Sequence, residues 1–190
     1  EMLTVELTVS FEGQVKRVVT ATTVDRIVRV PIEMIMKGDL DPFRVWAPGS
    51  PNLYDLRVRL LKGGDTLDQV DTYFGMRKIE RRDGRIYLNN SPLYQKLILD
   101  QGYWPDSNIT PPSDEAIRLD LQYILDFGYN GARKHQKLED PRFYYWADKM
   151  GVLVWGEVPS PYDFTDETVR NLADTMFGFI ERDFNHPSII

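Results

Sequence analysis

The chain has 190 residues, of which 42% are hydrophobic and 12% aromatic, and this is enough for one large domain or two small ones. Its formal net charge of −6 argues against nucleic acid or an anionic membrane surface as a partner, because both require a basic patch. With no cysteine, disulfides and thiolate metal sites are excluded, but the cellular compartment stays unknown.

Charge and aromatic content change near residue 78. Residues 1–78 contain eleven basic and eleven acidic residues, so the whole net charge of −6 falls in residues 79–190. Only six of the 23 aromatic residues precede this point. We therefore place a domain boundary here and expect the ligand chemistry in the second part.

The first part, residues 1–78, has the alternating pattern of half-buried strands. Leu3, Val5, Leu7 and Val9 share one face of a strand, and similar segments follow between Gly and Pro turns. We predict an antiparallel immunoglobulin-like β-sandwich without helices. Such sandwiches have about seven strands in ~100 residues, so we expect this one to lack its first strands. The predicted strands span 3–9, 14–21, 25–32, 54–60 and 66–74.

The second part, residues 79–190, alternates strands with helices. Ser113 is the expected N-cap of one helix, while Pro141 and Gly151 mark the start and end of another. This order predicts a parallel sheet, either doubly wound or closed into a (β/α)8 barrel, and periodicity does not choose between them. A hairpin is predicted over 83–94, strands over 94–100, 129–133 and 152–155, helices over 113–128, 140–151 and 165–184, and a further strand beginning at Ser188.

Five segments, in order, resemble glycoside hydrolase family 2, which includes β-galactosidases, β-glucuronidases and β-mannosidases. They are "WAPGSPNLYDLRV" (46–58), "FGMRKIERRDGRIYLNNSPLY" (74–94), "DFGYNGARKH" (126–135), "WADKMGVLVWGEVP" (146–159) and "FNHPSII" (184–190). The resemblance implies a partial sandwich over 1–78 followed by the first half of a TIM (β/α)8 barrel over 79–190.

The resemblance also implies retaining hydrolysis of β-glycosidic bonds by two glutamates, which follow barrel strands four and seven. Strand four would begin at Ser188, so neither glutamate is expected in this chain. We therefore expect an internal fragment that is inactive alone. The alternative is a non-catalytic carbohydrate-binding or scaffold homologue, which an Asn-Glu pair encoded shortly after Ile190 would exclude. The sugar could be a galactoside, a glucuronide or a mannoside.

Barrel enzymes place their sites at the carboxyl ends of the strands. The resemblance implies that Arg133 supports the nucleophile and that Glu157 lies near the sugar, whereas a bland interpretation makes Arg133 a surface ion pair. For the aromatic residues, the alternative to sugar binding is a place in an ordinary surface loop or in the core. For His135, the alternative is a structural role. The expected substrate-binding residues are Asp100, Gln101, Tyr103, Trp104, Arg133, His135, Trp155 and Glu157.

No cofactor or metal is expected, because Pro159 stands where metal-binding relatives carry a histidine. The expected partners are a carbohydrate, bound by the longer protein, and a second copy of the chain. Half a barrel would leave strand edges unpaired, and such edges promote self-association.

Overall fold

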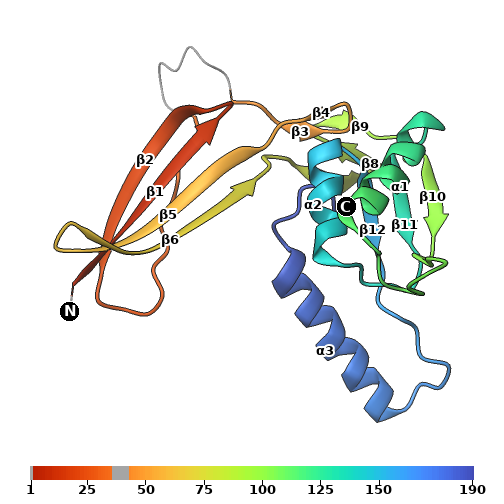
Figure 1. The fold of residues 1–190 in the computed structure, drawn as a ribbon. Coiled ribbons are helices and arrows are strands. Elements are labelled where there is room, and N and C mark those ends of the chain that lie inside the picture. Colours follow the sequence, from red (N-terminus) through yellow and green to blue (C-terminus); the bar gives the residue numbers. More distant parts are fainter. Residues whose placement is uncertain (1, 36–42) are drawn as a thin grey trace. The chain divides into compact units, whose positions relative to one another are not determined.

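The computed structural model describes residues 2–35 and 43–190 (Figure 1). The described chain forms two compact units. The first combines Glu1–Arg44 with Asn52–Phe74, and the second combines Val45–Pro51 with Gly75–Ile190.

The first unit is built on a four-stranded antiparallel sheet in the order β2-β1-β5-β6. Its strands are β1 (Leu3–Phe11), β2 (Gln14–Thr23), β5 (Tyr54–Lys62) and β6 (Asp65–Phe74). Glu12 and Gly13 both have positive φ in the β1–β2 turn, as two-residue hairpins require. One face carries the predicted alternating apolar residues, with Leu7 opposite Val58 and Val9 opposite Leu56.

A strand predicted over residues 25–32 is absent from the structure, and this prediction was wrong. Residues 24–35 contain no strand, and Ile27 is 83% exposed, so the apolar alternation there buries little surface. The carbonyls of Glu33 and Met34 accept hydrogen bonds from the Arg17 guanidinium, at 3.0 and 3.1 Å, instead of from a neighbouring strand. Within the described residues of the first unit, the structure therefore shows one sheet.

The second unit begins with short antiparallel elements. These are the β3–β4 pair (Trp46–Ala47 and Ser50–Pro51) and a three-stranded sheet of β7 (Ile79–Arg82), β8 (Arg85–Leu88) and β9 (Ser91–Pro92). Trp46 lies within residues 1–78, which the sequence predicts to form the sandwich. Instead it is fully buried in the second unit, where its indole Nε1 donates to the backbone carbonyl of Asp148 at 2.8 Å.

The predicted parallel sheet is confirmed. It comprises β10 (Leu97–Asp100), β11 (Gly131–Lys134) and β12 (Leu153–Gly156), all parallel. Beyond β12, Val154 donates to the carbonyl of Ser188 at 2.9 Å and accepts from the backbone of Ile190 at 3.1 Å. Residues 188–190 thus begin to pair as a further parallel strand, as the sequence predicted.

Three helices accompany this sheet: α1 (Asp114–Asp126), α2 (Pro141–Met150) and α3 (Asp166–Asp183). The predicted caps are confirmed, since Ser113 accepts from the backbone of Ala116 and Gly151 closes α2 in the left-handed conformation. Helices α1 and α2 cover one face of the sheet. The resulting core includes Ile117, Leu121, Ala132, Phe143, Tyr144, Ala147 and Val154.

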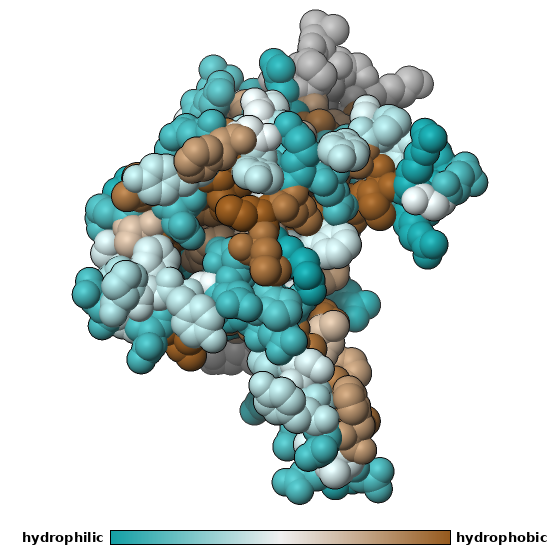
Figure 2. All heavy atoms as spheres, turned by 90° about the vertical axis from the view of Figure 1, so that its right-hand side faces the viewer, coloured by the Kyte–Doolittle hydropathy of each residue, from teal (hydrophilic) through white to brown (hydrophobic). Residues whose placement is uncertain are grey.

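Helix α3 leaves much of its apolar side exposed. Phe179 packs against the core, whereas Phe177 is 70% exposed. Figure 2 shows apolar side chains along one side of this helix, the lowest element in that view. None of the helices within residues 2–35 and 43–190 is long and apolar enough to cross a membrane.

Candidate functional site

The carboxyl ends of β11 and β12 bring Arg133 and Glu157 together. Arg133 lies in register with Leu99 and Trp155, so all three side chains share one face of the sheet. Their neighbours in the strands, such as Ala132, pack against α1 and α2 on the other face. The Arg133 guanidinium donates through Nε to the Glu157 carboxylate. The structure thus places these two predicted site residues in direct contact.

Glu157 is held at both of its oxygen atoms. Oε1 accepts from Arg133, and Oε2 accepts from the backbone N–H of Gln136 at 3.1 Å. The hydrogen bond from Arg133, followed by that from Gln136, lowers the pKa of Glu157 below its usual value, although partial burial opposes the shift. Glu157 is therefore a fixed carboxylate at neutral pH.

Gln136 reaches Glu157 through an uncommon backbone conformation. Its φ of 54° lies in the left-handed region, which non-glycine residues rarely adopt and which costs about 1–3 kcal/mol. Such conformations persist where the surrounding structure holds them, often at binding sites. Here, the left-handed conformation accompanies the hydrogen bond from the backbone N–H of Gln136 to Glu157.

The strand-end loops also bring Gln101 and His135 together. Gln101 Nε2 lies 3.2 Å from His135 Nδ1, and the backbone of His135 donates to the Asp100 carbonyl at 2.9 Å. Trp155 is 40% exposed on the Arg133 face, and Tyr103 is 70% exposed in the loop after β10. The indole Nε1 of Trp104 is buried, and its backbone N–H donates to Asn108 at 2.6 Å, which closes that loop on itself.

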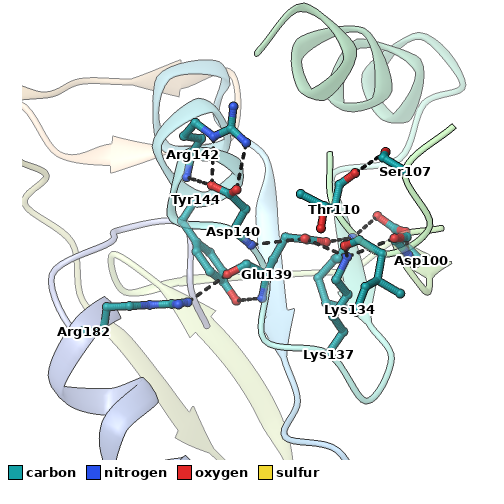
Figure 3. Close-up of polar contacts among 12 residues, drawn as sticks. Asp100, Ser107, Thr110, Lys134, Lys137, Glu139, Asp140, Arg142, Tyr144 and Arg182 are labelled. Atoms are coloured by element: carbon teal, nitrogen blue, oxygen red, sulfur yellow. Dashed lines mark hydrogen bonds and ion pairs between the residues drawn. The ribbon is translucent and has the colours of Figure 1, made fainter. Parts of the chain in front are cut away.

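Asp100 faces away from this group. Its position in β10 alternates with that of Leu99, and its Oδ2 lies 2.6 Å from Nζ of the buried Lys134 (Figure 3). Its Oδ1 accepts from the backbone of Gly102 at 2.7 Å. These contacts are structural and lie on the helix-covered side of the sheet.

Asp100 belongs to a buried cluster of four charges that the sequence reasoning missed (Figure 3). Lys134 Nζ also lies 2.6 Å from Glu139, whose other oxygen is 2.9 Å from Lys137. Lys134 and Glu139 are each about 1% exposed at the side chain. Strand alternation was the one available signal, because it places Asp100 and Lys134 on the same face. Within the described chain, no group of three or more His, Asp or Glu side chains is arranged to hold a metal ion.

Comparison with known proteins relates this chain to a family. A sequence model of "Glycosyl hydrolases family 2" matches residues 2–77. A β-galactosidase of Thermoanaerobacter pseudethanolicus is 29% identical over 175 residues, which are 90% of this chain and 23% of that protein. A β-glucuronidase of Streptococcus agalactiae is 29% identical over 171 residues, covering 80% of this chain and 28% of that protein. Residues 2–77 thus match the model of glycoside hydrolase family 2, and these relatives extend the similarity over most of the chain.

A solved β-glycosidase structure shares the fold of this chain. The crystal structure of a β-glycosidase from Bacteroides vulgatus matches 100% of the chain with a TM-score of 0.80 and 23% identity. The chain covers 25% of that structure, in keeping with the coverage of 23% and 28% in the two relatives above. This chain therefore spans about a quarter of the length of the proteins it matches.

Proposed function

We propose that this chain is a piece of a β-glycosidase and supplies part of its sugar-binding site at the carboxyl ends of β10, β11 and β12. The observation that carries the proposal is the Arg133–Glu157 pair, fixed on the face of the sheet opposite α1 and α2. In this interpretation residues 1–78 belong to an immunoglobulin-like sandwich. Residues 79–190 form the first half of a TIM barrel, whose strand ends carry the site.

The proposed reaction is hydrolysis with retention. It needs two carboxyl groups about 5–5.5 Å apart, one to protonate the leaving oxygen and one to attack the anomeric carbon. Glu157 suits neither role, because both of its oxygens are engaged and its pKa is lowered chiefly by Arg133. A general acid needs a raised pKa. The two catalytic glutamates are therefore assigned to the rest of a longer protein, of which the chain would be about a quarter.

The residues of this chain would bind and orient rather than react. Arg133 carries a planar, always-charged fork, and it would hold a catalytic carboxylate ionised beside the sugar. Trp155 shares the Arg133 face and would pack against a sugar ring. Asp100 would act indirectly, by fixing the loop after β10. The remaining proposed contacts to sugar come from Gln101, Tyr103, Trp104, His135 and Glu157.

The test is an assay of the longer protein that contains this chain. It would be given nitrophenyl β-galactoside, β-glucuronide and β-mannoside, and the anomer first released would be identified by proton NMR. Hydrolysis of one of these with release of the β anomer supports the proposal. Release of the α anomer would refute retention, and binding of sugars without hydrolysis of any glycoside would favour the non-catalytic homologue.

A further inference from the structure

A groove of about 810 Å³ lies at the strand ends, between the loops that follow β10, β11 and β12. Its volume falls in the range of roughly 300–1,000 Å³ that is usual for small-molecule sites. Two exposed tyrosine rings line it, Tyr103 from the loop after β10 and Tyr162 from the segment after β12. Gln101 and His135 lie along the same groove.

The groove adjoins the Arg133–Glu157 pair. His135 and Gln136 both line the groove, and the backbone N–H of Gln136 donates to Glu157 at 3.1 Å. One residue thus contacts the carboxylate of the pair and forms part of the groove. A ligand with one ring at the pair and a second ring attached to it would extend into the groove.

The buried charge cluster holds the walls of the groove in place (Figure 3). Lys137 Nζ donates to the carbonyl of Gly102 at 2.9 Å and to that of Ile109 at 2.5 Å, which ties the loop after β10 to the loop after β11. From α3, Arg182 donates to the carbonyl of Glu139 at 2.8 Å. A site fixed in this way loses little conformational entropy when a ligand binds.

The charges that line the groove are already neutralised. The ammonium group of Lys137 has three hydrogens, and its partners are Glu139 and the carbonyls of Gly102 and Ile109. Arg182, the other lysine or arginine in the described lining, pairs with Asp183 at 2.6 Å. An anionic ligand would have to displace these partners, so the groove favours a neutral one.

We propose that this groove holds a neutral sugar residue, linked to the sugar that occupies the Arg133–Glu157 site. The preferred substrate is then a β-linked oligosaccharide with an uncharged ring at this position, and not an isolated monosaccharide glycoside. The apolar faces of a pyranose would pack on the rings of Tyr103 and Tyr162, and its hydroxyls would bond to Gln101 and His135. The inference rests on the proposed function for the neighbouring site.

The experiment uses the 190-residue chain with ¹³C-labelled tyrosine rings, observed by NMR. The probes are the neutral disaccharides lactose, cellobiose and β-1,4-mannobiose. Each is compared with the methyl glycosides of its component monosaccharides and with the corresponding disaccharide in which one ring is glucuronic acid. We expect at least one neutral disaccharide to shift the Tyr103 and Tyr162 signals and to bind more tightly than its component monosaccharides. Its form with glucuronic acid in the groove should bind more weakly.

Tyr103→Ala should weaken binding of that disaccharide about fivefold or more, within the range that aromatic contacts contribute. The matched control is Tyr123→Ala, which removes an exposed ring of α1 outside the groove and should leave the affinity unchanged. The inference is overturned if no neutral disaccharide shifts the two signals, or if Tyr103→Ala has no effect.

The same titrations separate this inference from the proposed function. If Arg133→Ala abolishes binding while Tyr103→Ala does not, the groove assignment fails and the strand-end site stands. If a neutral disaccharide binds through Tyr103 but the longer protein hydrolyses no glycoside, the groove assignment holds and the proposed function fails.

Discussion

Replacing Lys134 with methionine should destabilise the second unit strongly. The ammonium group is about 1% exposed and lies 2.6 Å from both Asp100 and Glu139. It also lies 4.5 Å from the centre of the Phe143 ring, a favourable cation–π position. Methionine fills a similar volume without the charge. After the substitution, Asp100, Glu139 and Lys137 remain in the cluster, so one buried negative charge has no positive partner.

Removing one partner of a buried ion pair costs about 3–5 kcal/mol, because the remaining charge is left in a medium that solvates it poorly. The free energy of unfolding of a domain is about 5–15 kcal/mol, so this loss would be a large fraction of it. The control is Lys96→Met, at an exposed lysine just before β10, which should change stability by less than about 0.5 kcal/mol.

Urea unfolding followed by tryptophan fluorescence measures this loss. All four tryptophans (46, 104, 146 and 155) lie in the second unit, so the signal reports that unit and not the four-stranded sheet. In a double-mutant cycle, Asp100→Asn should cost less in the Lys134→Met background than in the wild type. A loss below about 1 kcal/mol for Lys134→Met, or costs that simply add, would refute the assigned role of the cluster.

Three further outcomes are expected of the 190-residue chain. Arg133→Ala should change its thermal midpoint little, because the half-exposed pair with Glu157 contributes only about 0–1 kcal/mol, and a large loss would make Arg133 structural. Burial raises the pKa of Tyr144 to about 12. As the pH rises, the unfolded chain therefore loses the phenolic proton of Tyr144 before the folded chain does, and the free energy of unfolding should fall between about pH 10 and about pH 12. Tyr144→Phe should abolish that alkaline component in urea titrations, and its persistence would assign it elsewhere. The exposed side chains of Leu99 on β10 and Phe177 on α3 should promote self-association, which a monomer by light scattering at all concentrations would contradict.

Local signals predicted much of the second unit. Ser113 and Gly151 were identified as helix caps from residue type and spacing alone, because capping depends on contacts within one turn. Strands 94–100, 129–133 and 152–155 were predicted as parallel because each is followed by a helix, and the structure pairs β10, β11 and β12 in this way. These features follow from short-range chemistry.

Long-range contacts account for what the sequence did not reveal. Alternation in residues 25–32 shows that a strand is possible, but it does not show whether a neighbouring edge is free to pair. The indole of Trp46 donates a hydrogen bond to the backbone carbonyl of Asp148, which lies 102 residues later in the chain. No local pattern identifies such a contact. At the site, Arg133 and Glu157 were identified from their positions at the strand ends. The charges around Lys134 come from the end of β10 and from the loop after β11, and they were not identified.

The turnover of a glycoside by the longer protein carrying Arg133→Ala tests the central claim most directly. The substrate is whichever nitrophenyl glycoside the wild type hydrolyses, and Arg118→Ala, at an exposed arginine of α1, is the control. If Arg133 holds a catalytic carboxylate in place, kcat should fall tenfold or more, while the thermal midpoint and the control variant stay close to wild type. An unchanged kcat for Arg133→Ala would contradict a sugar site at these strand ends.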